Sequence, residues 1–241
     1  MRMVNSILPL SLERVCYEIG GRRLIDDLSC TFAAGSRSVI LGPNGAGKSL
    51  TLRLCHGLLR PTSGSVRWLG PAASRAAERQ AMVFQRPVML RRSVAANVAY
   101  ALAVRGVARR RRGGPVAQAL ARVNLEEAAD RPARALSHGE QQRVAIARAW
   151  VLEPEVLFLD EPTANLDPEG TRTVEEAIEA VHRSGAKIVM TTHDMGQARR
   201  LADEVLFLHR GRLVEHAAAG DFFAAPQSRE AAAFLKGELL W

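Results

Sequence analysis

Residues 42 to 49 read GPNGAGKS and match the phosphate-loop pattern G-x-x-x-x-G-K-[ST]. Glycines allow successive backbone N–H groups to point toward a polyanion, because they adopt conformations that a side chain would forbid. In this pattern Lys48 reaches the β- and γ-phosphates of a nucleotide, and the Ser49 hydroxyl is a ligand for Mg²⁺. The stretch therefore predicts a nucleotide site, which by itself suits a kinase or a GTPase equally well.

A second pair of chemically capable residues, Asp160 and Glu161, follows the apolar run VLFL. A carboxylate at the carboxyl end of a buried strand can hold magnesium. Because adjacent side chains on an extended segment point in different directions, Asp160 can serve the metal while Glu161 faces a water near the γ-phosphate. The chain has no guanine-reading N-K-x-D segment, since Asn44 precedes a glycine and Asn165 precedes a leucine. This weighs against a GTPase.

The stretch LSHGEQQR, residues 136 to 143, looks like half of another phosphate site. Ser137 stands where it can cap a helix, and Gly139 follows in the first turn. The positive end of such a helix, with its free N–H groups, attracts anions. The stretch lacks the lysine that a phosphate site usually carries, so these residues alone leave its ligand open.

Hydrophobic periodicity and turn residues predict the elements that position these residues. Gly20 and Gly21 between two β-rich segments predict an N-terminal hairpin, and the alternation after residue 156 predicts a parallel sheet covered on both faces. The expected strands are 10–19, 22–33, 38–42, 65–69, 81–85, 156–160, 187–193 and 204–209, followed by a hairpin at 209–216. The expected helices are about 48–57, 93–104, 115–125, the segment from 136, 168–183, 195–202, 221–225 and 228–240.

Residues 93–136 carry helical patterns without a strand signal, which predicts a helical insertion. We therefore expect an α/β fold: a P-loop NTPase core with a mostly parallel sheet, an N-terminal antiparallel β subdomain and an inserted helical subdomain. The whole chain, 1–241, is expected to form one domain, with its core at about 1–90 and 145–241 and its helical subdomain at about 91–144. The run Arg109–Arg112 predicts an exposed loop that is solvated, or contacts lipid headgroups or a partner protein.

The composition is that of a globular protein, with 241 residues, 47% hydrophobic residues and a net charge of +8. The charge permits an acidic partner, but aromatic residues reach only 5%, too few for a single-strand nucleic-acid surface. No apolar run is long enough to span a bilayer, and the N-terminus lacks the features of a signal peptide. The three cysteines, Cys16, Cys30 and Cys55, have no metal-type spacing and predict buried thiols in a reducing compartment.

Taken in order, the motifs resemble those of the ATP-binding subunit of ABC (ATP-binding cassette) transporters, over nearly the whole chain. The residues that carry the resemblance are Tyr17, GPNGAGKS, Gln85 in VFQ, LSHGEQQRVAIARA, VLFLDEPTANLD and His193 in TTHD. The resemblance implies an ATPase with Mg²⁺ as cofactor. It implies ATP contacts from Tyr17, Gly42, Pro43, Asn44, Gly45, Ala46, Gly47, Lys48, Ser49 and Leu50, and Mg²⁺ ligands from Ser49, Gln85 and Asp160.

The resemblance also implies individual roles. Tyr17 is expected to stack on adenine, and Gln85 to touch Mg²⁺ and move with a membrane partner. Glu161 is expected to be the catalytic carboxylate, with His193 contacting the γ-phosphate and Asp167 lying at a dimer seam.

The family pattern suggests what LSHGE would bind, because it resembles a signature that completes the nucleotide site of a second copy. Ser137, His138, Gly139 and Glu140 would face the nucleotide held by the partner's loop in a head-to-tail dimer. The chain departs from the pattern at His138, where a glycine is usual, and at Glu140, where a glutamine is usual. A negative charge there could weaken this binding unless Glu140 turns to an arginine such as Arg143.

The resemblance implies further partners: an integral membrane permease, docked at QRPVMLRRSVAANVAYAL, and a substrate-binding protein. The expected location is the cytoplasmic face of the inner membrane, as a peripheral subunit. The segments FQRPVMLRRSVAANVAYAL and FLKGELLW are most similar to cassettes of oxyanion importers, tungstate first and phosphate or molybdate next.

Other functions stay open, namely an ABC ATPase of another transporter (amino acid uptake or export) or one that acts on nucleic acid or drives a membrane partner. The segment between Lys48 and Ser137 has neither the heptads nor the CxxC pairs of repair-type members, and the chain holds one cassette. No nucleic-acid partner is expected.

Overall fold

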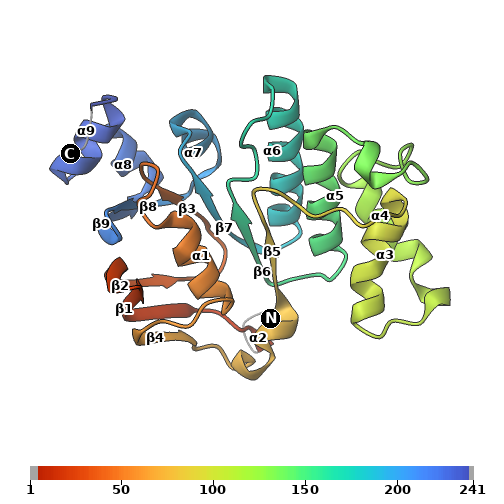
Figure 1. Cartoon of the computed structure of the whole chain (residues 1–241), viewed down its shortest axis with the longest axis horizontal. Coiled ribbons are helices and arrows are strands. Elements are labelled where there is room, and N and C mark those ends of the chain that lie inside the picture. Colours follow the sequence, from red (N-terminus) through yellow and green to blue (C-terminus); the bar gives the residue numbers. More distant parts are fainter. Residues whose placement is uncertain (1–4, 239–241) are drawn as a thin grey trace. The chain divides into compact units, whose positions relative to one another are not determined.

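The computed structural model of the chain describes residues 5–238, which form two compact units (Figure 1). One unit contains the chain up to Gln80 together with the segment from Lys187 onward, and the other contains Ala81–Ala186. The expected helical subdomain at about 91–144 lies within the second unit, and its boundaries stay a prediction. Within residues 5–238, no helix is both long and apolar enough to cross a membrane.

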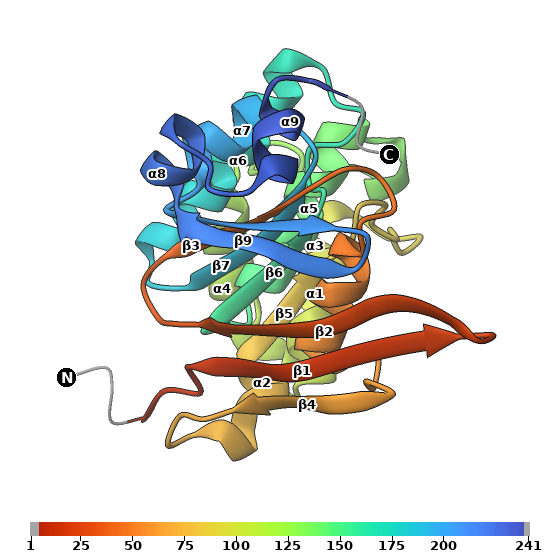
Figure 2. The same ribbon diagram turned by 90° about the vertical axis from the view of Figure 1, so that its left-hand side faces the viewer.

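Three strands near the N-terminus of the first unit form an antiparallel sheet, whose ribbons lie side by side in Figure 2. They are β1 (Leu10–Ile19), β2 (Arg22–Phe32) and β4 (Ser63–Trp68), in the order β2-β1-β4. Gly20 and Gly21 have φ angles of 57° and 75°, which suit the tight turn between β1 and β2. The predicted hairpin is confirmed.

The first unit also contains a mainly parallel set of strands. Its centre is β3 (Arg37–Leu41), which pairs in parallel with β7 (Lys187–Thr192) and β8 (Glu204–His209), while β9 (Arg212–Ala218) runs antiparallel to β8. All of β7 is buried, as expected for a parallel strand with both faces covered. The helices of this unit are α1 (Lys48–His56), α2 (Ala76–Arg79), α7 (Met195–Leu201), α8 (Ala219–Ala224) and α9 (Arg229–Leu235).

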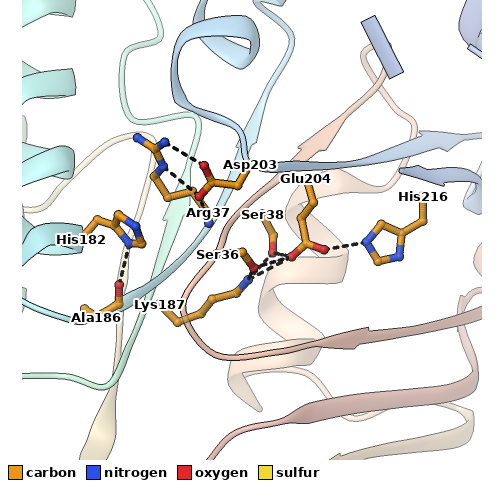
Figure 3. A network of polar contacts seen from close by, with 9 residues as sticks. All are labelled: Ser36, Arg37, Ser38, His182, Ala186, Lys187, Asp203, Glu204 and His216. Atoms are coloured by element: carbon orange, nitrogen blue, oxygen red, sulfur yellow. Dashed lines mark hydrogen bonds and ion pairs between the residues drawn. The ribbon is translucent and has the colours of Figure 1, made fainter. Parts of the chain in front are cut away.

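A polar network around the buried Lys187 joins β3, β7, β8 and β9 (Figure 3). Lys187 has a side chain that is 0% exposed, and its Nζ lies 3.0 Å from Glu204 Oε1 and 2.6 Å from the Ser36 hydroxyl. The same Glu204 oxygen accepts a hydrogen bond from Ser38, and Glu204 Oε2 lies 2.9 Å from His216 Nε2. Burial lowers the pKa of Lys187 although the Glu204 charge opposes this shift. The charges are retained because each has a hydrogen-bonded partner.

The second unit is mostly helical. Its strands β5 (Gln80–Val83) and β6 (Val156–Asp160) are neighbours, and all five residues of β6 are buried. Its α-helices are α3 (Val94–Val104), α4 (Gly113–Ala121), α5 (His138–Trp150) and α6 (Pro168–Arg183), and α5 packs against both α3 and α6. The predicted α/β fold, with mostly parallel strands and an antiparallel N-terminal sheet, is confirmed.

The arginine run between α3 and α4 forms one helical turn rather than a loop. Arg109–Arg111 make a short 3-10 helix, η3, and all three side chains are exposed. Arg112 is half-buried, and its Nε donates to the carbonyl oxygen of Val107 at 2.7 Å. The run is therefore ordered by its backbone and by Arg112, while three guanidinium groups face solvent.

Several predicted elements have different bounds in the structure; the helix predicted at 115–125, for example, is α4 at Gly113–Ala121. The strand predicted at 81–85 ends at Val83, because the side chain of Gln142 donates to the carbonyl oxygens of Phe84 and Gln85. The strand β4 begins at Ser63, two residues before the predicted start, because Gly64 has a φ of 79° and fits a bulge beside Arg14 that leaves no room for a side chain. The last helix ends at Leu235, short of the predicted end at residue 240, and residues 239–241 of FLKGELLW lie outside the described residues.

The sequence did not predict the helical segment from Ala73 to Arg79. It consists of a 3-10 turn, η2 (Ala73–Arg75), and the four-residue helix α2. Hydrophobic periodicity needs about 11 residues to become visible, so a segment this short gives no signal.

Candidate functional site

The phosphate-loop residues connect β3 to α1 in the first unit. At Gly42 a side chain would collide with the carbonyl oxygen of Leu208, and at Gly47, whose φ is 99°, a Cβ would lie 2.6 Å from Ile25 Cδ1. Both positions therefore require glycine, because the loop passes closer to its neighbours Leu208 and Ile25 than a side chain would allow. Neighbouring contacts hold the loop, since the Ala46 carbonyl accepts from the Gly211 N–H at 3.0 Å.

The start of α1 is built to receive an anion. Gly47 is the N-cap residue and supplies no side-chain cap, and the first turn contains no acidic residue. The N-terminal N–H groups of a helix lack intrahelical partners and carry a partial positive charge. The buried Lys48 lies across the loop, with Nζ donating to the carbonyl oxygens of Gly42 at 2.9 Å and Pro43 at 3.2 Å. A positive side chain and a positive helix end thus occupy one loop.

His193 and the phosphate loop leave the same edge of the parallel strands. Leu41, the last residue of β3, pairs with Thr192, the last residue of β7, so Gly42 and His193 are the next residues on neighbouring strands. The His193 side chain is exposed, and Asp194 beside it caps α7 by accepting from the Gly196 N–H at 2.7 Å. The first unit therefore brings the loop and His193 to one sheet edge, where ligands bind in parallel α/β sheets.

Tyr17 lies in the same unit, on the antiparallel sheet. It belongs to β1, pairs with Ile25 on β2 and is half-buried. Ile25 also contacts the position of Gly47, so β2 links the strand that carries Tyr17 with the phosphate loop. The aromatic face of Tyr17 is partly exposed, and its stacking role stays a prediction.

The acidic pair and Gln85 meet in the second unit. Asp160 is the last residue of β6 and is 3% exposed, whereas Glu161 is half-buried and has a φ of 43°. A positive φ costs about 1–2 kcal/mol for a residue with a side chain, so the backbone turns sharply after the buried acid. The Gln85 amide Nε2 donates to Glu161 Oε2 at 3.4 Å. The glutamine and the second carboxylate are therefore adjacent, and their donor and acceptor groups face each other.

Ser137 and Glu140 cap α5 reciprocally. The Ser137 hydroxyl accepts from the Glu140 N–H at 3.2 Å, and Glu140 Oε2 accepts from the Ser137 N–H at 2.8 Å. Glu140 Oε1 also lies 3.4 Å from Arg131. Burial favours the neutral acid, but the Ser137 hydrogen bonds and the arginine charge outweigh it and lower the pKa of Glu140. The carboxylate is ionised and bound to its own helix terminus.

Glu140 does turn to a nearby arginine, but this is Arg131 rather than Arg143, which the sequence suggested as an example. The Arg143 Nη1 donates to the carbonyl oxygens of Val123 at 2.8 Å and Asn124 at 2.9 Å. The charge of Arg143 still lowers the pKa of Glu140, as a smaller contribution than that of Arg131.

The signature residues and Asp167 line one hollow of about 490 Å³ in the second unit. Asp167 caps α6, because its Oδ1 accepts from the Gly170 N–H at 2.7 Å. The hollow is lined by Ser137, His138, Gly139, Glu140, Arg143, Asn165, Leu166, Asp167, Glu169, Gly170 and Thr173. The N-terminal ends of α5 and α6 therefore open onto the same surface, and the signature and dimer-seam roles of these residues stay predictions.

One residue of this region was missed by sequence reasoning. Gln142 is fully buried in α5 and bonds to the backbone of Gln85. Its signal was a polar residue on the apolar face of the helix, four positions before the buried Ile146. A glutamine at that position must find hydrogen-bond partners inside the protein.

Comparisons with known proteins identify the family to which the chain belongs. The family model described as ABC transporter matches residues 25–164. The chain is 42% identical to the tungstate uptake system ATP-binding protein TupC of Peptoclostridium acidaminophilum over 209 residues, covering 86% of this chain and 98% of that protein. It is 36% identical to the phosphate import ATP-binding protein PstB 2 of Natronomonas pharaonis, covering 96% of this chain and 88% of that protein.

A solved structure supports the fold. The structure of cbiO1 from Clostridium perfringens, described as part of the ABC transporter complex cbiONQ, superposes with a TM-score of 0.81 at 29% identity and 95% coverage of both chains. Because the family model matches more than half of the chain and these relatives cover most of it, this chain belongs to the ABC transporter family, as an ATP-binding subunit that hydrolyses ATP.

Proposed function

We propose that the chain energises the uptake of an oxyanion, tungstate first and phosphate or molybdate next, through a separate membrane permease. The observation that carries the cargo class is the 42% identity to TupC, which spans 98% of that protein. The phosphate relative and the molybdenum import ATP-binding protein ModC of Mycobacterium tuberculosis, 40% identical over 88% of this chain and 61% of that protein, support the oxyanion class.

In the proposed hydrolytic step, residues of both units have distinct roles. The phosphate loop and Lys48 bind the β- and γ-phosphates, and His193 contacts the γ-phosphate. A water attacks the γ-phosphorus in line, the bond to the ADP oxygen breaks, and Glu161 accepts the proton of the water. The Gln85 amide, 3.4 Å from Glu161, orients that carboxylate. Tyr17 stacks on the adenine.

Magnesium is the cofactor that these residues suit. Ser49, Gln85 and Asp160 offer a hydroxyl, an amide oxygen and a buried carboxylate, which are the hard oxygen ligands that Mg²⁺ prefers. When bound, Mg²⁺ neutralises phosphate charge.

The working unit in this proposal is a dimer. The capped N-terminus of α5 presents Ser137, His138 and Gly139 to the γ-phosphate held by the partner copy, so the signature needs no lysine of its own. Asp167 opens onto the same hollow and lies at the seam between the copies. Closure on ATP and opening after hydrolysis provide the movement that drives the permease.

The remaining partners follow from the transport role. The permease docks on the segment from Gln85 to Leu102, whose exposed residues include Val88 at 73% and Tyr100 at 43%. A substrate-binding protein delivers the oxyanion, and the chain works as a peripheral subunit at the cytoplasmic face of the inner membrane. No nucleic acid takes part.

The hydrolytic role is tested by Glu161→Gln in the purified chain. Because a general base contributes about 10²- to 10⁴-fold, we expect ATP hydrolysis to fall by that range while ATP binding is retained. Glu127→Gln removes a carboxylate from an exposed site in the same unit and should keep the wild-type rate. Hydrolysis by Glu161→Gln at the wild-type rate would contradict the assignment.

The cargo is tested by co-expression with candidate permeases and binding proteins. A binding protein loaded with tungstate should raise ATP hydrolysis by the assembled complex above the level with unloaded binding protein. If ATP hydrolysis rises only with a binding protein loaded with phosphate or molybdate, that ion rather than tungstate is the cargo. Stimulation of the chain by nucleic acid would contradict the transport function.

A further inference from the structure

Gln142 connects the signature helix to the segment that carries Gln85. It lies in α5, five residues after Ser137, and it is 0% exposed. Its Nε2 donates to the carbonyl oxygen of Gln85 at 3.1 Å and to that of Phe84 at 3.4 Å. Both partners are carbonyl oxygens, which can only accept, so the amide nitrogen must face them.

The bonds continue from Gln85 to Glu161. The backbone of Gln85 is held by Gln142, while its side-chain amide donates to Glu161 Oε2 at 3.4 Å. The three residues form one line of contacts from the buried face of α5 to the carboxylate after β6. All three lie in the second unit, so the line needs no contact outside it.

The chemistry of Gln142 indicates that its hydrogen bonds, rather than its packing, matter at this position. Its Oε1 is buried and has no hydrogen-bond partner among the described residues. A buried carbonyl without a partner costs free energy, which an apolar side chain of similar length would avoid. The contribution of the glutamine therefore lies in its two donated bonds, which stop β5 at Val83 and fix the backbone that follows.

We propose that Gln142 is a positioning residue that holds Gln85 in register with Glu161 and moves it together with the signature helix. The inference rests on the proposed hydrolytic function of Glu161. Ser137 and Gln142 are separated by about 7.5 Å along a rigid helix, so a shift of the helix terminus toward a phosphate is passed to Gln85. Engagement of the signature by a nucleotide thereby reaches the carboxylate that activates water.

The kinetic test is a double-mutant cycle on ATP hydrolysis. Gln142→Met keeps the length of the side chain but removes the donor, and we expect it to lower kcat about tenfold with a smaller change in KM. In Gln85→Ala the hydrogen bond from Gln85 to Glu161 is already lost, so adding Gln142→Met should lower kcat by less than twofold further. If the two losses multiply in the double variant, Gln142 acts through general stability and the proposal fails.

The matched control is the neighbouring glutamine. Gln141 is half-buried, and its Nε2 donates to the carbonyl oxygen of Leu136 at 2.9 Å, at the start of its own helix. Gln141→Met should keep kcat within about twofold of the wild type, since no contact leads from it to Gln85. An equal loss in both variants would also overturn the proposal.

Hydrogen exchange separates this inference from the proposed function. In Gln142→Met, the backbone amides of Phe84, Gln85, Arg86 and Val88 should exchange at least about fivefold faster than in the wild type, because the segment has lost its anchor. Unchanged exchange would overturn the positioning role even if ATP hydrolysis is confirmed. If Gln142→Met does not fold, Gln142→Leu serves the same two measurements. A wild-type chain without ATPase activity would refute the proposed function, and exchange would still decide whether Gln142 holds the segment.

Discussion

Glu140 places a negative charge at a helix terminus that is expected to receive phosphate. The structure reduces this conflict, because the carboxylate accepts the Ser137 N–H at 2.8 Å and lies beside Arg131. The negative charge of Glu140 is therefore balanced by the N–H donor of Ser137 at its own helix terminus and by the neighbouring Arg131. Two N–H groups of the first turn, those of His138 and Gly139, remain directed toward the N-terminal end of α5.

Replacing Glu140 by glutamine tests how much of that charge still acts on a nucleotide. A glutamine oxygen can keep the capping box, so we expect Glu140→Gln to change the free energy of unfolding by less than about 0.5 kcal/mol. Removing one negative charge near a phosphate should lower the ATP concentration for dimerisation about two- to fivefold. The measurement is size-exclusion chromatography with an ATP titration, using chains that also carry Glu161→Gln. A higher ATP requirement would show that Glu140 assists the nucleotide.

Single site residues differ in how well the sequence predicts them. The loop glycines and Lys48 follow a spacing that only one backbone arrangement satisfies, and the structure places them between β3 and α1 as expected. Gln142 and Lys187 have no such spacing, because their partners are distant backbone groups or side chains that meet only after folding. The sequence could not decide which arginine lies beside Glu140 for the same reason, since Arg131 and Arg143 are equally plausible in sequence.

The secondary-structure elements show where local patterns stop being sufficient. Long periodic segments such as α6, and apolar runs such as β6, have the bounds that the sequence predicts. Two of the errors lie at ends that tertiary contacts decide. The strand β5 stops where Gln142 captures two carbonyl oxygens, and β4 begins early because Gly64 can pass close to Arg14. Neither contact is visible in a window of neighbouring residues.

The network around Glu204 predicts a pH dependence of stability for the strands that it joins. Hydrogen bonds from His216 and Ser38 and the ammonium charge of Lys187 hold the pKa of Glu204 far below its usual range. Burial acts in the opposite direction but is outweighed. The folded chain therefore prefers the ionised carboxylate. The stabilisation is complete above the unfolded pKa of about 4.3 and is lost as pH falls from there through the lower folded pKa.

Glu204→Gln should lower the free energy of unfolding, measured by urea titration. The difference from the wild type should be largest at pH 6–7 and should shrink below about pH 4.3. Glu13→Gln is the control, because Glu13 pairs with Arg67 at 2.6 Å but is 50% exposed, so solvent screens the pair and its loss should change the free energy of unfolding little at any pH. A difference for Glu204→Gln that stays constant from pH 7 to pH 3 would show that ionisation of Glu204 contributes nothing.

For the whole molecule, similarity identifies the engine better than the cargo. Relatives of comparable identity are named for tungstate, phosphate, molybdenum and Fe(3+) import. The net charge of +8 permits acidic partners of several kinds. An ATP-binding subunit of an importer acts on a membrane partner, so its residues are selected by nucleotide and permease rather than by the transported ion. Cargo must therefore be assigned on the assembled complex.

The dimer proposal can be decided by mixing two inactive chains. Lys48→Ala removes the phosphate-binding lysine, and Ser137→Ala removes the signature hydroxyl, so each chain alone should hydrolyse little ATP. In a head-to-tail dimer of one chain of each kind, the intact lysine faces the intact serine at one site, while both defects fall in the other. Random pairing in an equal mixture makes half of the dimers mixed, so about a quarter of all sites should be intact and about a quarter of the wild-type rate should return. The unmixed variants at the same total concentration are the controls. If the mixture shows only the average of the two inactive chains, Ser137 does not serve the partner's nucleotide, and the signature acts within its own chain.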